Sequence, residues 1–216
     1  YGHKLINRMA VYTLPSDLIE FYKSNIQFIS DHAVDPDKRR YAVNGEAIKH
    51  YIDLDAWTGA DAKPLSRDLY HAIIFHSNFY LINDRDSILM FDTLAYKENK
   101  LIFNQAVLNK FLLLKNEVDL IFFSRWMRNI AWREYGSAQW NVSTDSLKNY
   151  ADFGDYKIWI DDNFTKHGIL PYSLEQTYSR LVTAFENKNY IQILKLSSDI
   201  GHYIGDAHVP LHTTKN

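Results

Sequence analysis

The hydrophobic pattern of the chain changes twice, and this change limits the folds that are open to it. Residues 4–12 and 15–33 carry apolar side chains at helical spacing. Between about residues 60 and 149 the pattern becomes one of short apolar runs separated by Asn, Asp, Lys and Glu. Helical spacing returns toward the end of the chain. The sequence therefore predicts a mainly α-helical protein with a mixed α/β insertion.

The domain boundaries follow from the same pattern. Domains average roughly 150 residues, so a chain of 216 residues can form one large domain or one domain with an insertion. We assign residues 1–58 and 150–216 to one helical domain. Residues 59–149 form an inserted, strand-rich segment of unknown role.

Local signals predict several boundaries within the helical regions. The charged stretch 35–40 contains a proline and is expected to be a loop, whereas 41–55 is expected to be a short helix or extended turn. Residues 134–146 are expected to be a second loop, because Gly, Ser, Thr and Asn cluster there. Ser173 and Gln176 resemble a capping box. They would begin a helix with one apolar face made of Leu174, Tyr178, Leu181, Val182 and Phe185.

Composition removes several classes of function. The chain has no cysteine, so disulfides, thiolate nucleophiles and cysteine metal sites are excluded, and a metal must be held by His and carboxylate. The formal net charge of -2 provides no general field to attract a polyanion. No run of about 18 apolar residues occurs, so no stable membrane insertion is expected. The first residue is Tyr1 rather than Met, which suggests a processed start.

The last predicted helix, from about Tyr190 to Ala207, carries the strongest chemical signal. His202 and Asp206 lie four residues apart, which places an imidazole and a carboxylate on one face of the helix. Such a pair alone is more often a surface hydrogen bond than a metal site. Gly201 and Gly205 share this spacing, and each costs roughly 1 kcal/mol relative to Ala inside a helix. We therefore expect another element to approach the helix closely at this point, and Pro210 to end the helix.

Three separated motifs resemble the zinc-dependent phospholipase C and single-strand-specific nuclease superfamily. The family has a helix with His-x3-Asp-x5-His, followed by small polar residues and Asn, and this chain has His202, Asp206 and His212. It also has an Asp about 15 residues before a His that is followed by an aromatic residue, an aliphatic residue and Asp. Asp35 and the stretch 50–53 (HYID) match this pattern. The Gly-His near the family's mature N-terminus matches residues 2 and 3.

The resemblance implies a trinuclear zinc site in a helical bundle of the phospholipase C and nuclease type. One zinc would be held by Asp35, His50, His202 and Asp206, and Asp206 would bridge to a second zinc. The second zinc would also take His3 and the backbone of a Trp expected before Tyr1. The third would take His212 and two ligands expected after Asn216. We expect up to three zinc ions in the complete protein and fewer in this stretch of chain.

The resemblance also implies hydrolysis of a phosphodiester by metal-activated water, in a secreted or periplasmic protein. Asp206 would set the metal spacing, and Asp35 would also assist proton removal. Tyr51 and Asp53 are candidates for substrate binding, with packing and loop hydrogen bonds as the other interpretation. The substrate is a phospholipid headgroup or single-stranded nucleic acid, and the near-neutral charge favours the phospholipase C-like activity. No protein partner is predicted.

Two other functions compete with this one. The first is a metal phosphohydrolase of the class with an adjacent His-Asp pair, and here the pair occurs in the reverse order as Asp31-His32. The second is a non-catalytic binding module in which the ligands persist as structure and the insertion serves as a partner surface.

Overall fold

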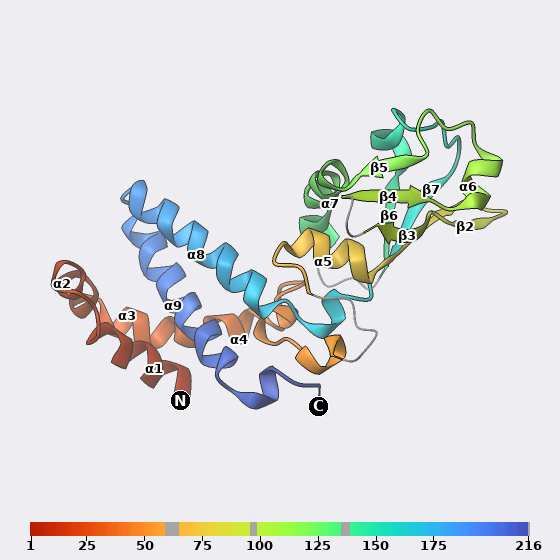
Figure 1. Ribbon diagram of the computed structural model, residues 1–216. Coiled ribbons are helices and arrows are strands. Elements are labelled where there is room, and N and C mark those ends of the chain that lie inside the picture. Colours follow the sequence, from red (N-terminus) through yellow and green to blue (C-terminus); the bar gives the residue numbers. More distant parts are fainter. Residues whose placement is uncertain (59–64, 96–98, 135–138, 216) are drawn as a thin grey trace. The chain divides into compact units, whose positions relative to one another are not determined.

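The computed structural model describes residues 1–58, 65–95, 99–134 and 139–215, and it is mainly α-helical with a mixed α/β part (Figure 1). The chain divides into two compact units. Unit 1 comprises Tyr1–Gly59 and His167–Asn216, and unit 2 comprises Ala60–Lys166. Residues 150–166, which we expected in the helical domain, therefore belong to unit 2. The reason is that a strand from this stretch pairs with two strands of unit 2.

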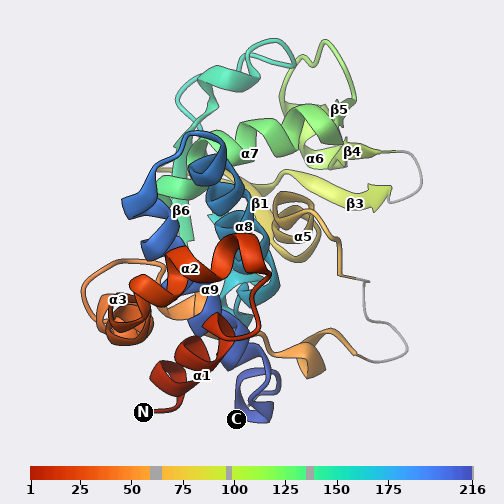
Figure 2. The ribbon, with the colours of Figure 1, turned by 90° about the vertical axis from the view of Figure 1, so that its left-hand side faces the viewer.

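Unit 1 consists of helices from both ends of the chain. The first segment supplies helices α1 (Gly2–Val11), α2 (Ser16–Ser24), α3 (Ile26–Asp31), η1 (His32–Val34), α4 (Asp35–Arg39), η2 (Ala47–His50) and η3 (Leu54–Trp57). The second supplies α8 (Leu170–Glu186), α9 (Tyr190–Ala207) and η6 (Pro210–His212). In Figure 2, α1 and the segment that follows α9 lie at the same end of this unit.

The central helix, α9, has the bounds predicted from the sequence, and its glycines allow α1 to approach it closely. The Asn189 side chain caps the helix by accepting a hydrogen bond from the backbone N–H of Gln192. A Cβ atom added at Gly201 would lie 2.0 Å from Oδ1 of Asn7 in α1. One added at Gly205 would lie 3.0 Å from Nδ1 of His3. The expected close approach to α9 is thus confirmed, and the approaching element is α1.

The apolar core of unit 1 lies between α1, α2, α3, α8 and the first half of α9. Its buried members are Val11, Tyr22, Ile29, Ala184, Ile193 and Leu196. The second half of α9 instead buries polar side chains, among them His202 and Asp206. Unit 1 therefore separates an apolar end, which supplies cohesion, from a polar end where chemistry is possible.

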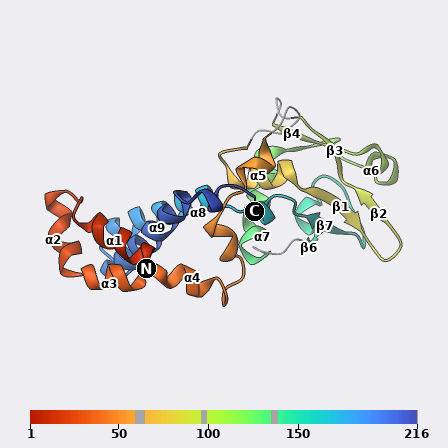
Figure 3. The same ribbon diagram turned by 90° about the horizontal axis from the view of Figure 1, so that it is seen from below.

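Unit 2 contains two small antiparallel sheets. The first has the strand order β2-β1-β7-β6, and Figure 3 shows β1 and β7 side by side at its centre. The second has the order β3-β4-β5. The strands are β1 (Asn78–Ile82), β2 (Ser87–Leu89), β3 (Phe91–Ala95), β4 (Lys100–Phe103), β5 (Glu117–Asp119), β6 (Gln139–Ser143) and β7 (Lys157–Asp161). The helices are α5 (Leu69–His76), α6 (Gln105–Lys110) and α7 (Leu120–Glu134), with short turns η4 (Thr144–Leu147) and η5 (Thr165–His167).

Aromatic side chains form the core of unit 2. The Phe79 and Phe91 rings each pack edge-on against Phe123, with ring centroids 5.2 and 5.3 Å apart. Phe91 also stacks on Phe103. The high aromatic content of the chain thus supplies a core for unit 2 that is separate from the core of unit 1.

Three local predictions were wrong. Residues 35–39 form helix α4 rather than a loop, because Pro36 suits a first turn and acidic and basic residues lie at the favourable ends. Helix α8 begins at Leu170, so Ser173 is a buried interior residue and not a cap. Residues 139–143 form a strand, whereas 135–138 lie outside the described residues. The helix predicted to follow Ser173 is confirmed as part of α8, and on its apolar face Leu181 packs against the core whereas Tyr178, Val182 and Phe185 are exposed.

No helix in the described part of the chain is both long enough and apolar enough to span a membrane.

Candidate metal centre

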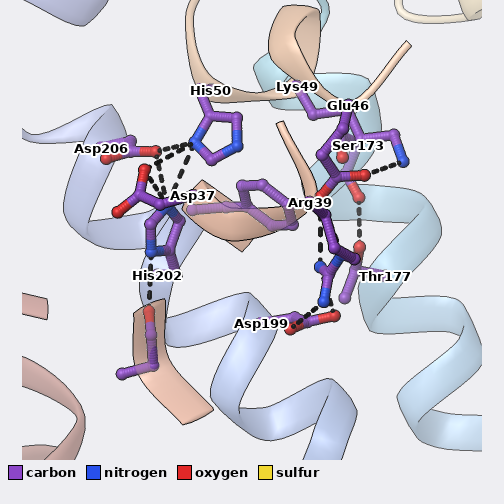
Figure 4. A network of polar contacts seen from close by, with 12 residues as sticks. Asp37, Arg39, Glu46, Lys49, His50, Ser173, Thr177, Asp199, His202 and Asp206 are labelled. Atoms are coloured by element: carbon purple, nitrogen blue, oxygen red, sulfur yellow. Dashed lines mark hydrogen bonds and ion pairs between the residues drawn. The ribbon is translucent and has the colours of Figure 1, made fainter. Parts of the chain in front are cut away.

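Four side chains from unit 1 point their donor atoms at one another (Figure 4). His50 Nδ1 lies 2.8 Å from Asp206 Oδ2 and 3.1 Å from His202 Nε2, and His202 Nε2 lies 3.2 Å from Asp206 Oδ2. Asp37 Oδ1 lies 3.7 Å from His202 Nε2 and 4.0 Å from His50 Nδ1. Neighbouring ligands of a tetrahedral zinc ion are about 3.3 Å apart when each bond is about 2.0–2.1 Å long. The observed separations bracket this value, so these residues can hold one metal ion.

Three elements bring these donors together. The helix α9 presents His202 and Asp206 one turn apart on its buried face, as their spacing predicts. The η2 turn delivers His50, which is also buried. The short helix α4 lies against α9 and supplies Asp37, whose side chain is 48% exposed. The cluster thus combines three buried donors with one donor that is open to solvent.

The orientation of the His202 ring suits a metal ligand. Its Nδ1–H donates a hydrogen bond of 2.8 Å to the backbone carbonyl of Ala33. This assignment leaves the lone pair of Nε2 directed at His50 and Asp206. Histidines that bind metals almost always donate their other ring N–H to a carbonyl or carboxylate in this way. The Ala33 carbonyl therefore fixes the ring in the form that metal binding needs.

Electrostatics make Asp206 an anionic centre. Burial opposes its ionisation, but hydrogen bonds from His202 and His50 outweigh this cost and lower the pKa of the carboxyl far below its usual range. For His202, burial opposes the charged ring, yet the hydrogen bond to Asp206 raises its pKa above the usual value. Protons therefore compete with a metal ion for this ring, since only the neutral imidazole can be a ligand.

Two further histidines lie on the other oxygen of Asp206. His3 Nε2 is 3.3 Å from Asp206 Oδ1, and His212 Nε2 is 3.9 Å from the same atom. The His3 ring stacks on His202, and burial together with His202 lowers the pKa of His3. Oδ2 of Asp206 therefore faces His50 and His202, and Oδ1 faces His3 and His212. This arrangement suits a carboxylate that bridges two ions.

The structure brings Asp37 into this cluster and not the predicted ligand Asp35. The Asp35 carboxylate pairs with His32 Nδ1 at 2.5 Å and with Lys38 Nζ at 2.7 Å. Residues two apart in a helix differ by about 200° in direction, so Asp35 and Asp37 cannot face the same site. Recognising residues 35–39 as a helix would have revealed this difference.

The two predicted substrate-binding residues lie elsewhere. The Asp53 carboxylate accepts a hydrogen bond of 3.0 Å from His167 Nδ1, and the edge of the His167 ring packs on Trp57. The Tyr51 carbonyl lies against Gly168, where an added Cβ would be 2.0 Å away. Their described contacts are thus structural and join the two segments of unit 1.

Sequence reasoning missed a second polar network, which lies beside the metal ligands (Figure 4). Glu46 is 2% exposed and accepts hydrogen bonds from Lys49 Nζ at 2.8 Å, from Arg39 and from the Tyr203 hydroxyl. Arg39 also pairs with Asp199 at 2.9 Å. The Tyr203 ring in turn packs edge-on against His50, with centroids 5.4 Å apart. Tyr203 thereby couples this network to a metal ligand.

Comparisons with known proteins assign no family. No family model and no solved structure matches the chain. Among curated proteins, a probable serine protease of Bradyrhizobium tropiciagri is 32% identical over 82 residues. This match covers 38% of the chain and 10% of that protein. The chain thus spans a small part of the relative, and the activity of the relative does not carry over.

Proposed function

We propose that unit 1 is a metal-dependent hydrolase of phosphodiester bonds, similar to zinc-dependent phospholipase C, with zinc as its ion. The observation that carries the proposal is the close grouping of donor atoms from Asp37, His50, His202 and Asp206, with separations of 2.8–4.0 Å. Nitrogen and carboxylate donors suit zinc, and the chain has no cysteine that would favour a closed structural site. The relative is named a probable serine protease, which is consistent with a hydrolase in general but supports neither zinc dependence nor a phosphodiester substrate.

Each side chain has a distinct part in this proposal. His50 and His202 would hold the ion from the buried side, and Asp206, whose other oxygen faces His3 and His212, would be a further ligand. Bound zinc supplies a water of pKa near 7 and a Lewis acid for a phosphoryl oxygen. Asp37 is the ligand that solvent reaches, so its carboxylate is positioned to accept a proton from water that attacks the phosphorus.

The substrate class distinguishes two versions of the proposal. A phospholipase C-like enzyme cleaves a phospholipid at its headgroup, whereas a nuclease cleaves single-stranded nucleic acid. The net charge of -2 supports the first, because tight binding of a polynucleotide normally needs a basic surface.

The test joins metal content to turnover. The zinc-loaded protein should hydrolyse bis(p-nitrophenyl) phosphate, and His50→Ala or Asp206→Ala should remove bound zinc and turnover together. Asp37→Asn should weaken zinc binding, because it replaces an anionic ligand by a neutral amide. Zinc is measured by competition with a chromophoric chelator. Parallel assays with phosphatidylcholine and single-stranded DNA then separate the phospholipase from the nuclease.

Two control variants make this test specific. Asp35→Asn changes a carboxylate two residues away and should leave zinc affinity and turnover unchanged. His208→Ala should do the same, since His208 is exposed and bonds to the Ile204 carbonyl. A zinc-loaded protein that retains the metal but hydrolyses none of these substrates would instead favour a non-catalytic binding module. Equal losses in Asp35→Asn and Asp37→Asn would contradict the assigned ligand set.

A further inference from the structure

Unit 1 contains a second polar cavity, which lies on the side of Tyr203 away from the metal ligands. Its volume is about 530 Å³, within the range of small-molecule sites. The walls come from the α4–η2 region, from α8 and from α9. Its buried polar lining includes Glu46, Ser173 and Thr177, each less than a tenth exposed. Such a polar lining is suited to a strongly hydrated ligand.

The carboxylates that line this cavity are all paired with cations, whereas two of the lining cations have no anionic partner among the described residues. The three lining carboxylates all have cationic partners: Asp35 pairs with Lys38, Glu46 with Lys49, and Asp199 with Arg39. Two lining cations, Arg180 of α8 and Lys195 of α9, form no hydrogen bond or ion pair with any residue that the structure describes. The cavity therefore offers two positive charges, from Arg180 and Lys195, that are unpaired in the described part of the chain, beside carboxylates whose negative charges are already neutralised by cations.

The ionic network around Glu46, which lines the cavity, is not explained by stability alone. Removing the Glu46 carboxylate from water carries a desolvation penalty that its half-buried partners Arg39 and Lys49 repay only in part, and apolar residues often serve as well at such positions. A buried ionic network beneath an open cavity is thus weak evidence for stability. It is better explained as a rigid support that holds neighbouring groups for a ligand.

We propose that this cavity binds a small phosphomonoester, with the phosphate between Arg180 and Lys195. The guanidinium of Arg180 matches two phosphate oxygens, and the ammonium of Lys195 adds a point charge. The amides of Gln176 and Gln192, which also line the cavity, offer donors and acceptors to a hydroxyl-rich body. This site needs no metal ion, so it stands independently of the proposed hydrolase activity.

Calorimetry in the presence of a metal chelator tests this site separately from the metal centre. The probes are glucose 6-phosphate, inorganic phosphate and glucose. Glucose 6-phosphate should bind saturably at one site and more tightly than inorganic phosphate, and glucose should not bind. Binding should weaken with added salt, because exposed charges are screened.

A matched pair of variants locates the site. Arg180→Ala/Lys195→Ala should weaken glucose 6-phosphate binding about 100-fold, about tenfold for each charged hydrogen-bond donor removed. Arg125→Ala/Lys23→Ala removes the same charges from exposed helical positions outside the cavity and should leave affinity unchanged. All four residues are exposed, so neither variant should impair folding. The proposal fails if the wild type shows no saturable binding of glucose 6-phosphate. It also fails if glucose binds, if inorganic phosphate binds as tightly as glucose 6-phosphate, or if both double variants have the same affinity.

Discussion

The metal centre depends on the direction in which each carboxylate of α4 points. Asp37 faces His50 and His202, whereas Asp35, two residues earlier, is held by His32 and Lys38. A helix turns by about 100° per residue, so the two side chains leave opposite sides of α4. Chemically identical residues therefore contact different groups because of the helical geometry between them.

Glu46 shows how a buried charge can be stabilised by its surroundings. Burial disfavours its carboxylate, but hydrogen bonds from Lys49 and Tyr203 reverse the effect and lower its pKa below the ordinary 4.5. A carboxyl whose pKa is lower in the folded protein stabilises the fold above its unfolded pKa. This contribution is lost as the pH falls through the folded value.

Replacing this carboxylate should alter the pH dependence of stability. Near neutral pH, Glu46→Gln should reduce the free energy of unfolding by about 3 kcal/mol, because Lys49 and Arg39 lose a buried partner. Between about pH 5 and pH 3 the wild type should lose stability more steeply than the variant, which has no group to protonate here. Urea unfolding followed by far-ultraviolet circular dichroism measures both. The exposed Glu175→Gln is the control, and an equally steep decline in Glu46→Gln would contradict this account.

Among the elements, the packing of α1 on α9 determines whether His3 reaches Asp206. Gly201 and Gly205 leave one stripe of α9 without side chains, and α1 lies over this stripe. Asn7 of α1 donates a hydrogen bond of 2.9 Å to the Ser198 carbonyl, which holds the two helices in register. The cost of glycine inside a helix is thus offset by contacts that a larger residue would prevent.

Gly201→Ala should therefore destabilise unit 1 although alanine favours helix. The new Cβ would lie 2.0 Å from Asn7 Oδ1, so either the Asn7 side chain must give up its hydrogen bond to the Ser198 carbonyl or α1 must shift. We expect a net loss of about 2 kcal/mol, since overpacking outweighs the gain in helix propensity. Zinc affinity at the His3 side of Asp206 should fall as well. Gly2→Ala, where an added Cβ meets nothing within 4 Å, should cause neither loss. Unchanged stability of Gly201→Ala would show that the two helices separate easily.

At the scale of the whole molecule, the chain builds two cores from interleaved segments. Unit 1 is formed by the two ends of the chain, and unit 2 by the segment between them. The predicted metal ligands that meet at Asp206 all belong to unit 1. Four of the five tryptophans belong to unit 2, and Trp57 belongs to unit 1. Metal binding and tryptophan fluorescence therefore report mainly on different units.

The proposed zinc site predicts that zinc stabilises unit 1 selectively. At a free zinc concentration 100 times the dissociation constant, binding to the folded state adds about 2.7 kcal/mol. The transition seen by far-ultraviolet circular dichroism should contain a component that moves to higher temperature with zinc. The tryptophan fluorescence transition, dominated by unit 2, should move little. In His202→Ala both transitions should be insensitive to zinc, and a zinc-dependent shift of the fluorescence alone would place the ion in unit 2.

The sequence alone determined the features that depend on local order. Periodicity predicted the bounds of α9 and the change from a helical to a mixed region, and the His202–Asp206 spacing predicted two donors on one face. The glycines at 201 and 205 predicted the close approach of another element. These features follow from the geometry of a single helix, which a few consecutive residues define.

Only the tertiary structure decided which distant groups meet. It selected Asp37 over Asp35, moved residues 150–166 into unit 2 through strand pairing, and placed Glu46 and Arg39 beside Tyr203. Such pairings depend on which faces of separate elements become buried together, and that choice minimises the free energy of the whole unit. Short-range patterns carry no direct record of it, because residues more than 150 positions apart, such as His50 and Asp206, become neighbours when the chain folds.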